Sequence, residues 1–122
     1  MNYSEAVNYI ENLQAEAGSD LSLKQVKYLA DMIGNPENKS RIIHIAGTNG
    51  KGSVCSFLNT MLIKSQKSVG LFTSPHLVHM NERIRINGEM ISNQEFTDVF
   101  EKVKNAVAIL ESRGGVHPSF FE

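Results

Sequence analysis

The sequence predicts an α/β fold with three layers and a mostly parallel sheet, of the type built around a phosphate-binding loop. Two observations carry this prediction. An apolar run at 42–46 leads directly into a glycine-rich turn at 47–53. Apolar residues then recur at helical spacing over 54–62, and a second short apolar run follows at 69–72. A strand, a turn, a helix and a second strand in this order form a unit of the expected size for a β-α-β crossover.

Composition narrows the classes of protein that fit. The chain has 122 residues, 41% of them hydrophobic, which suits a single domain with a real core. A net charge of −1 argues against a nucleic-acid partner. We see neither an apolar run near the ~20 residues of a membrane span nor a basic leader at the N-terminus. The single cysteine, Cys55, excludes an internal disulfide. We therefore expect a cytoplasmic protein with no membrane partner.

Two helices are predicted ahead of the first strand. The first covers about 4–16, and a small polar joint at 18–20 follows it. The second begins at a capping-box pair, Ser22 and Gln25, and carries an apolar stripe up to its stop at Gly34.

The next elements surround the glycine-rich turn. The segment 41–46 is the predicted first strand, and its near-continuous apolar character is typical of a central parallel strand covered on both faces. The helix after the turn is predicted to end near 65, and the second strand covers 69–72.

The remaining segments combine a loop, a hairpin and a long helix. The stretch 73–83 contains Pro75 and lacks a clean periodicity, so we interpret it as a functional loop. Asn87-Gly88 predicts a type I′ hairpin turn. A capping-box pair, Ser92 and Glu95, then begins an amphipathic helix that we expect to end near 113–115.

The glycine-rich turn is a candidate phosphate cradle. It consists of Gly47, Thr48, Asn49, Gly50, Lys51, Gly52 and Ser53. Glycines allow backbone N–H groups to converge on an anion, the following helix adds its positive end, and Lys51 adds a full charge. We expect Ser53 to cap the helix. The common pattern G-x-x-x-x-G-K-[ST] is not met at Ile45 or at Gly52, and a turn without any ligand is the alternative interpretation.

Two blocks of sequence resemble a known family. The block 45–53, and the block 69–77 followed by 81–86, are similar to the nucleotide loop and to the second strand with its Ω-type loop in folylpolyglutamate synthases and bifunctional dihydrofolate synthases. These enzymes belong to the Mur ligase superfamily. Gly52 departs from the common phosphate-loop pattern but matches this family, and the order and spacing of the two blocks agree with it as well.

The resemblance implies what the chain is part of. Residues 1–122 would be the N-terminal part of an ATP-binding domain of the Mur ligase central type, so the domain is incomplete and the C-terminal glutamate-binding domain is absent. The implied reaction joins L-glutamate to a folate or dihydropteroate carboxylate through an acyl phosphate, with ATP and Mg²⁺. We expect no amide-bond formation by this chain alone, and a monomer for the full-length protein.

The resemblance also implies roles for single residues. Lys51 would be catalytic, and residues 47–53 would bind ATP. Ser74 would supply a hydroxyl ligand to Mg²⁺. His76 and Arg83 would contact substrate or phosphate, or else only order their loop. Asp20 and Leu21 resemble a stretch that contacts the pterin, although a plain helix-entry turn is the alternative. The family's further metal ligands lie outside residues 1–122.

Other functions stay open at this point. Another Mur-type amide ligase, such as a muramyl-peptide enzyme, would share the phosphate loop. The stretch 73–76 and the Asn81-Glu82-Arg83 run favour the folate enzymes over it. A non-catalytic nucleotide-binding module is the alternative from another class. Gly52 and the missing glycine at Ile45 count against an ordinary P-loop kinase or GTPase.

Overall fold

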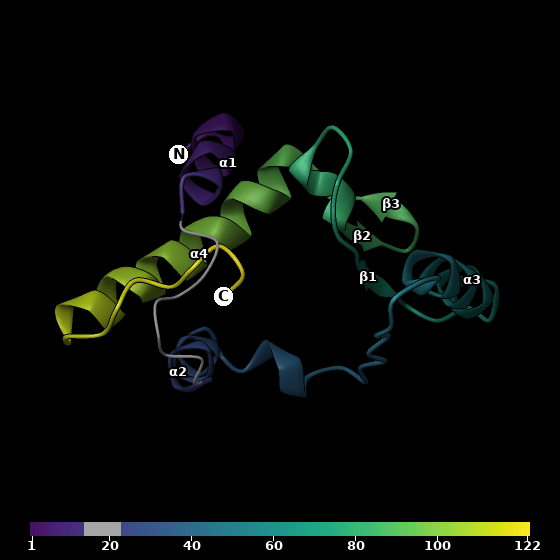
Figure 1. Cartoon of the computed structure of the whole chain (residues 1–122), viewed down its shortest axis with the longest axis horizontal. Helices are drawn as coiled ribbons and strands as arrows, with labels where there is room; N and C mark the ends of the chain where they lie inside the picture. Colours follow the sequence, from purple (N-terminus) through teal and green to yellow (C-terminus); the bar gives the residue numbers. More distant parts are fainter. Residues whose placement is uncertain (14–22) are drawn as a thin grey trace. The chain divides into compact units, whose positions relative to one another are not determined.

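The computed structural model describes residues 1–13 and 23–122. The chain forms two compact units, one from residues 1–42 with 97–122 and the other from residues 43–96, and Figure 1 labels their elements. Within the described ranges, none of the helices combines the length and the apolar character that a membrane span requires.

The helix α1 (Tyr3–Glu11) opens the first unit. A reciprocal capping box begins it: the Asn2 side chain accepts the Glu5 amide at 2.9 Å, and the Glu5 carboxylate accepts the Asn2 amide at 2.8 Å. The helix ends at Asn12, whose side-chain amide donates to the Asn8 carbonyl at 2.7 Å. The helix therefore ends before the predicted bound near 16, with Asn12 at its C-cap.

The helix α2 (Lys24–Met32) follows, and the short 3₁₀ helix η1 (Pro36–Asn38) comes after it. The predicted stop at Gly34 is confirmed, because Gly34 has φ +92° directly after the last helical residues. Such a left-handed residue is the common end of an α-helix. Of the predicted capping pair, Ser22 lies outside the described residues, and no side chain caps α2 at Leu23.

The long helix α4 (Asn93–Ser112) provides the surface on which the first unit packs (Figure 1). Its predicted capping box is confirmed, since the Ser92 hydroxyl accepts the Glu95 amide at 3.1 Å and the Glu95 carboxylate accepts the Ser92 amide at 2.7 Å. Tyr9 of α1 meets Phe100 edge to face, with 5.5 Å between ring centroids. The buried cluster consists of Leu29 from α2 with Ala106, Val107 and Leu110 from α4.

The second unit contains a small sheet and one long helix. The sheet has the order β1-β2-β3, from β1 (Gly70–Phe72), β2 (Ile84–Ile86) and β3 (Glu89–Met90). The helix α3 (Lys51–Lys64) precedes β1, and the 3₁₀ helix η2 (Met80–Arg83) leads into β2. Both strand pairs are antiparallel.

The predicted hairpin turn is confirmed. Asn87 and Gly88 have φ values of +51° and +89° and link two strands in which Ile86 faces Glu89. A two-residue turn with both φ values positive has the twist that antiparallel strands need.

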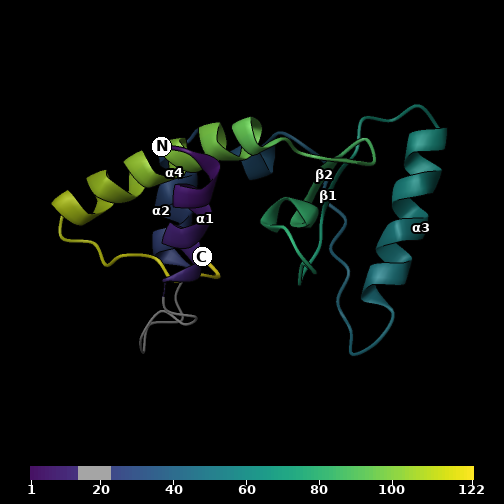
Figure 2. The same ribbon diagram turned by 90° about the horizontal axis from the view of Figure 1, so that it is seen from above.

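Two predictions about the sheet are corrected. The segment 41–46 is not a strand; Figure 2 shows it as part of a plain trace that leads into α3, and Ile42 and Ile43 are 68% and 62% exposed. The described sheet is antiparallel, whereas we predicted a mostly parallel one. β1 pairs with β2 of the following hairpin, and no strand among the described residues pairs with 41–46. An apolar segment becomes a central strand only where neighbouring strands and helices cover it.

Candidate nucleotide-binding site

The glycine-rich turn reaches α3 through two glycines with positive φ. Gly47 has φ +150° and Gly50 has φ +79°. Gly50 is the residue before the first helical turn, and no side chain caps α3 there in the described chain. The first amides of α3, beginning at Lys51, are therefore left for another acceptor, and the positive end of the helix dipole lies at the same place. This backbone arrangement suits an anion.

The Lys51 side chain folds back over the turn. Its ammonium donates to the Gly47 carbonyl at 2.6 Å, four residues earlier in the chain. The predicted capping role of Ser53 is corrected: Ser53 lies inside the first turn of α3, and Gly50 occupies the cap position. The reason is that the helix begins as early as Lys51, so the serine is already helical when the cap is needed.

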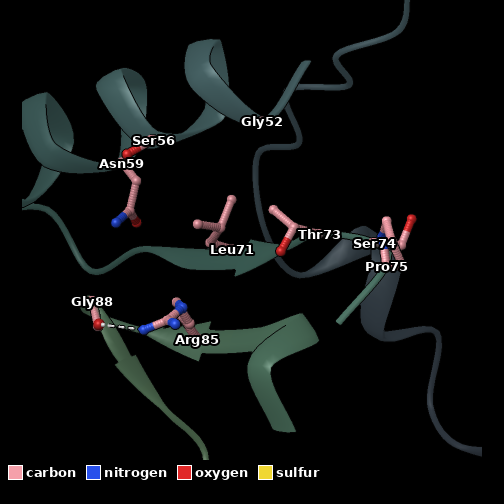
Figure 3. A pocket seen from close by; sticks show the side chains of 9 residues that line it. All are labelled: Gly52, Ser56, Asn59, Leu71, Thr73, Ser74, Pro75, Arg85 and Gly88. Carbon is pink, nitrogen blue, oxygen red and sulfur yellow. Dashed lines mark hydrogen bonds between the residues drawn. The ribbon is translucent and has the colours of Figure 1, made fainter. Parts of the chain in front are cut away.

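A pocket of about 520 Å³ lies beside the first half of α3. The residues that line it are Gly52, Ser56, Asn59, Leu71, Thr73, Ser74, Pro75, Arg85 and Gly88. All belong to the second unit. Figure 3 shows Asn59 reaching from α3 toward the strand that carries Leu71, with Ser74 and Pro75 beyond the end of that strand. The pocket thus combines one residue of the glycine-rich turn, Gly52, with Ser74 of the loop that follows β1.

The chemistry of the lining favours an anionic group. Among the described lining residues, Arg85 is the one charged side chain, and no carboxylate is present. The Arg85 guanidinium donates to the Gly88 carbonyl at 3.4 Å (Figure 3). The Asn59 Oδ1 atom is buried and has no hydrogen-bond partner among the described residues. A buried polar atom without a partner is costly. This oxygen only accepts, so it calls for a donor such as water or a ligand N–H or O–H group, and the preference for an anion rests on Arg85.

Sequence reasoning missed both Asn59 and Arg85. A weak signal for Arg85 exists, because a charged residue stands between Ile84 and Ile86 in a short strand. Asn59 carries no comparable signal, since an asparagine in a helix is ordinarily an exposed residue. Their common pocket depends on α3 lying next to the sheet, which local sequence does not reveal.

The loop 73–83 is tied at its base and at its middle. The Thr73 amide donates to the Arg83 carbonyl at 2.9 Å, which closes the base. The Arg83 Nε donates to the His76 Nδ1 at 2.8 Å. Since an arginine N–H always donates, the proton of the neutral His76 ring lies on Nε2 in this arrangement. The two predicted substrate residues are therefore brought together, although neither lines the pocket.

The carboxylate of Glu82 organises the outer part of the same loop. It accepts the amides of His79 at 2.7 Å, Val78 at 2.8 Å and Leu77 at 2.9 Å. These backbone hydrogen bonds, with that of His79 the strongest cause, lower the pKa of Glu82 from 4.5 to about 2. The carboxylate is therefore ionised throughout the physiological range.

The remaining predicted site residues are Asp20, Leu21 and Ser74. Asp20 and Leu21 lie outside the described residues. Ser74 is exposed and offers its hydroxyl at the pocket. Within residues 1–13 and 23–122, no cluster of three or more histidine, cysteine or acidic side chains is arranged to hold a metal ion. A metal at this pocket would therefore need ligands such as phosphate oxygens and waters besides Ser74, a set that Mg²⁺ accepts.

Comparison with curated proteins finds clear relatives. A dihydrofolate synthase/folylpolyglutamate synthase of Bacillus subtilis is 38% identical over 120 residues, which are 98% of this chain and 28% of that protein. The enzyme of the same description from Escherichia coli is 33% identical, over 95% of this chain and 26% of the relative. The chain thus spans less than a third of the length of these relatives. No protein-family model matches it.

Solved structures agree with these relatives. A folylpolyglutamate synthetase from Lactobacillus casei superposes with a TM-score of 0.89 at 34% identity, over 99% of this chain and 30% of that one. A folylpolyglutamate synthase from Thermotoga maritima gives a TM-score of 0.86 at 34% identity, over 98% and 27% of the two chains. A complex described as FPGS with AMPPCP and folate gives 0.90 at 33% identity, over 99% and 30%. These neighbours confirm the predicted α/β class and its match to the N-terminal domain of such structures.

Proposed function

Because this chain belongs to the folylpolyglutamate and dihydrofolate synthase family, we propose that it is part of a ligase that joins L-glutamate to a folate or dihydropteroate carboxylate at the expense of ATP. Residues 1–122 would be the N-terminal part of the ATP-binding domain, and the glutamate-binding domain would lie outside them. The coverage of 28% of the Bacillus subtilis relative supports this division, and we expect no amide-bond formation by residues 1–122 alone.

The observation that carries the proposal is the shared pocket of Gly52 and Ser74. Gly52 belongs to the turn whose amides open α3, and Ser74 brings a hydroxyl to the same space from a different element. The residues that line this pocket therefore fit a nucleoside triphosphate with its metal ion. The uncapped start of α3 would bind phosphate oxygens, and the Ser74 hydroxyl suits a hard cation such as Mg²⁺.

We assign the following roles. The backbone of residues 47–53 would cradle the phosphates of ATP. The Lys51 ammonium would exchange its contact with the Gly47 carbonyl for a phosphate oxygen, at the β and γ positions. His76, with its proton on Nε2, and Arg83 would present hydrogen-bond donors toward the substrate or phosphate side of their loop. Asp20 and Leu21 would contact the pterin.

The reaction explains why such residues are needed. A carboxylate is a poor electrophile, so its conversion to an acyl phosphate creates a good leaving group for attack by the amine of glutamate. Bound Mg²⁺ would offset the negative charge on the phosphate oxygens. Lys51 and the first amides of α3 would offset the rest of that charge from fixed positions, which is the main contribution a protein makes to phosphoryl transfer.

The proposal also covers the location, the oligomeric state and the partners of the full-length protein. We propose a cytoplasmic, monomeric full-length enzyme whose partners are small molecules. The net charge of −1 supports the absence of a nucleic-acid partner, because nucleic-acid binders carry a basic excess.

Calorimetry with ATP and Mg²⁺ on this chain tests the nucleotide site, and measurable binding is the expected result. The ligase activity is tested with a longer protein that contains residues 1–122, by glutamate-dependent release of ADP. We expect release with dihydropteroate or with a tetrahydrofolate. Activity on a muramyl substrate alone would contradict the folate assignment. ATP binding with no ADP release on any of these substrates would instead indicate a non-catalytic nucleotide-binding module.

A further inference from the structure

We propose that Glu82 is a positioning residue, whose carboxylate holds the loop 73–83 in shape so that Ser74 is in place for the metal ion before any ligand binds. This inference rests on the proposed function, because the loop serves the proposed nucleotide and metal site. Glu82 touches neither the pocket nor Lys51, so its action is indirect.

The geometry is that of a backbone wrapped around one anion. Three successive amides, those of Leu77, Val78 and His79, converge on the two oxygens of the Glu82 carboxylate at 2.7–2.9 Å. Hydrogen bonds to an ionised acceptor are stronger than those between neutral groups. Successive amides point to one place only if the backbone curves tightly, so the carboxylate selects one shape of the loop among many.

Apolar side chains contribute little to the shape of this part of the loop. The Leu77 and Val78 side chains are 92% and 74% exposed, so apolar packing does not hold the backbone there. The next two residues behave differently, because Met80 and Asn81 are each 6% exposed. The Asn81 side chain donates to the Ile91 carbonyl and to the Asn93 side chain, both at 2.9 Å, and anchors η2. Glu82 therefore connects an exposed tip to an anchored helix.

The effect extends to Ser74 through the base of the loop. Thr73, which precedes Ser74, donates its amide to the carbonyl of Arg83, which follows Glu82. The Arg83 side chain also holds His76 through Nδ1. Ser74 lies between these two ties. Loss of the Glu82 carboxylate frees residues 77–79, which join His76 to η2, and so loosens the tie between His76 and Arg83. We expect the Ser74 hydroxyl to be less well placed in consequence.

Two variants and a control test the loop itself. Glu82→Ala removes the acceptor, and Glu82→Gln retains one oxygen without the charge. Glu89→Gln removes the same charge from an exposed residue of the neighbouring strand β3. We expect amide hydrogen exchange at Leu77, Val78 and His79 to accelerate at least about tenfold in Glu82→Ala and by less in Glu82→Gln. It should stay unchanged in Glu89→Gln. Exchange at the wild-type rate in Glu82→Ala would overturn the proposal.

A second measurement separates positioning from general stability. ATP affinity is measured by calorimetry with and without Mg²⁺ for the same variants of the full chain. Glu82→Ala should reduce the increase in affinity that Mg²⁺ brings, while the metal-free affinity, which depends on the turn before α3, stays the same. Equal losses in both conditions, or no loss in either, would overturn the positioning role. Absence of ATP binding by the unmodified chain would contradict the proposed function, and the exchange data would still decide whether Glu82 holds the loop.

Discussion

The Lys51 ammonium and the Gly47 carbonyl are joined by a hydrogen bond of 2.6 Å, so the glycine-rich turn is closed by its own lysine. The lysine is the first residue of α3, and the carbonyl belongs to the first glycine of the turn. The Lys51 charge, which contacts phosphate in the proposed function, therefore already lies over the turn. Ligand binding would require only that this ammonium exchange the Gly47 carbonyl oxygen for a phosphate oxygen.

The first prediction concerns this charge. Lys51→Ala should weaken ATP binding by about 1.5–3 kcal/mol, roughly 10- to 150-fold, because a charge-assisted contact to phosphate is lost. Lys102→Ala is the matched control, since Lys102 is an exposed lysine of α4 in the other unit. Calorimetric titration with ATP measures both. Equal affinities of Lys51→Ala and the unmodified chain would refute the role of Lys51.

The second prediction compares two glycines of the same turn. Gly50 has φ +79°, and the space around its Cα is open. Gly50→Ala should lower the free energy of unfolding by about 1 kcal/mol, because a residue with a Cβ is strained in the left-handed region. Gly52 also has open space but lies within α3 without a positive φ. Gly52→Ala should raise the free energy of unfolding by about 0.5 kcal/mol, because alanine favours a helix over glycine.

Denaturant unfolding without nucleotide measures this pair, so that effects on binding do not enter. The opposite signs are the essential outcome. A loss of stability in both variants, of similar size, would mean that crowding rather than backbone conformation governs the turn.

The third prediction concerns pH. The pKa of Glu82 is about 2 in the folded chain, against an ordinary value of 4.5. Because the folded value is the lower one, the carboxylate stabilises the loop fully above pH 4.5. This contribution decreases as the pH falls below 4.5 and is lost once the pH passes through about 2. Amide exchange at Leu77–His79, corrected for intrinsic rates, should show this loss of protection.

Glu82→Gln provides the comparison for that experiment, because a glutamine side chain does not titrate in this range. Its exchange rates should show no such step. A step centred near pH 4.5 in the unmodified chain would contradict the three hydrogen bonds to Glu82, since an unperturbed carboxyl group titrates there.

The fourth prediction concerns the core of the first unit. Leu110 is 7% exposed and packs with Leu29 of α2. Leu110→Ala should lower the free energy of unfolding by about 2–4 kcal/mol, because it removes apolar contacts and leaves a cavity. Ile109 is 42% exposed on the same helix, so Ile109→Ala should cost clearly less. Thermal and denaturant unfolding of the two variants check this difference, and similar losses would place the core elsewhere.

Local features of this chain could be predicted from the sequence, whereas contacts between distant segments could not. The capping box of Ser92 and Glu95 and the turn at Asn87-Gly88 were predicted and are confirmed. Both depend on residues within three positions of each other, whose backbone preferences act whatever the rest of the chain does. The segment 41–46 was predicted as a strand from its apolar character alone. Its pairing depends on distant partners, and the described strands pair with one another instead.

In the candidate site, too, local features could be predicted from the sequence and distant contacts could not. The glycine-rich turn and Lys51 were found from local pattern, because the conformation that glycine allows and the charge of lysine are properties of the residues themselves. Asn59 and Arg85 were missed, although both line the pocket with Gly52 and Ser74. Glu82 was noted only as part of a family-like run, and its three amide partners became evident from the loop geometry.

The sequence by itself determined the presence of the four described α-helices, the hairpin turn and the glycine-rich turn before α3, since each depends on neighbours along the chain. Tertiary structure alone decided that Ser74 shares a pocket with Gly52, that Arg83 holds His76, and that none of the described strands pairs with 41–46. The physical reason is that such contacts form only when distant segments are brought together. Such a contact forms only where the packing of the whole unit offsets the entropy that is lost when the intervening loop is closed.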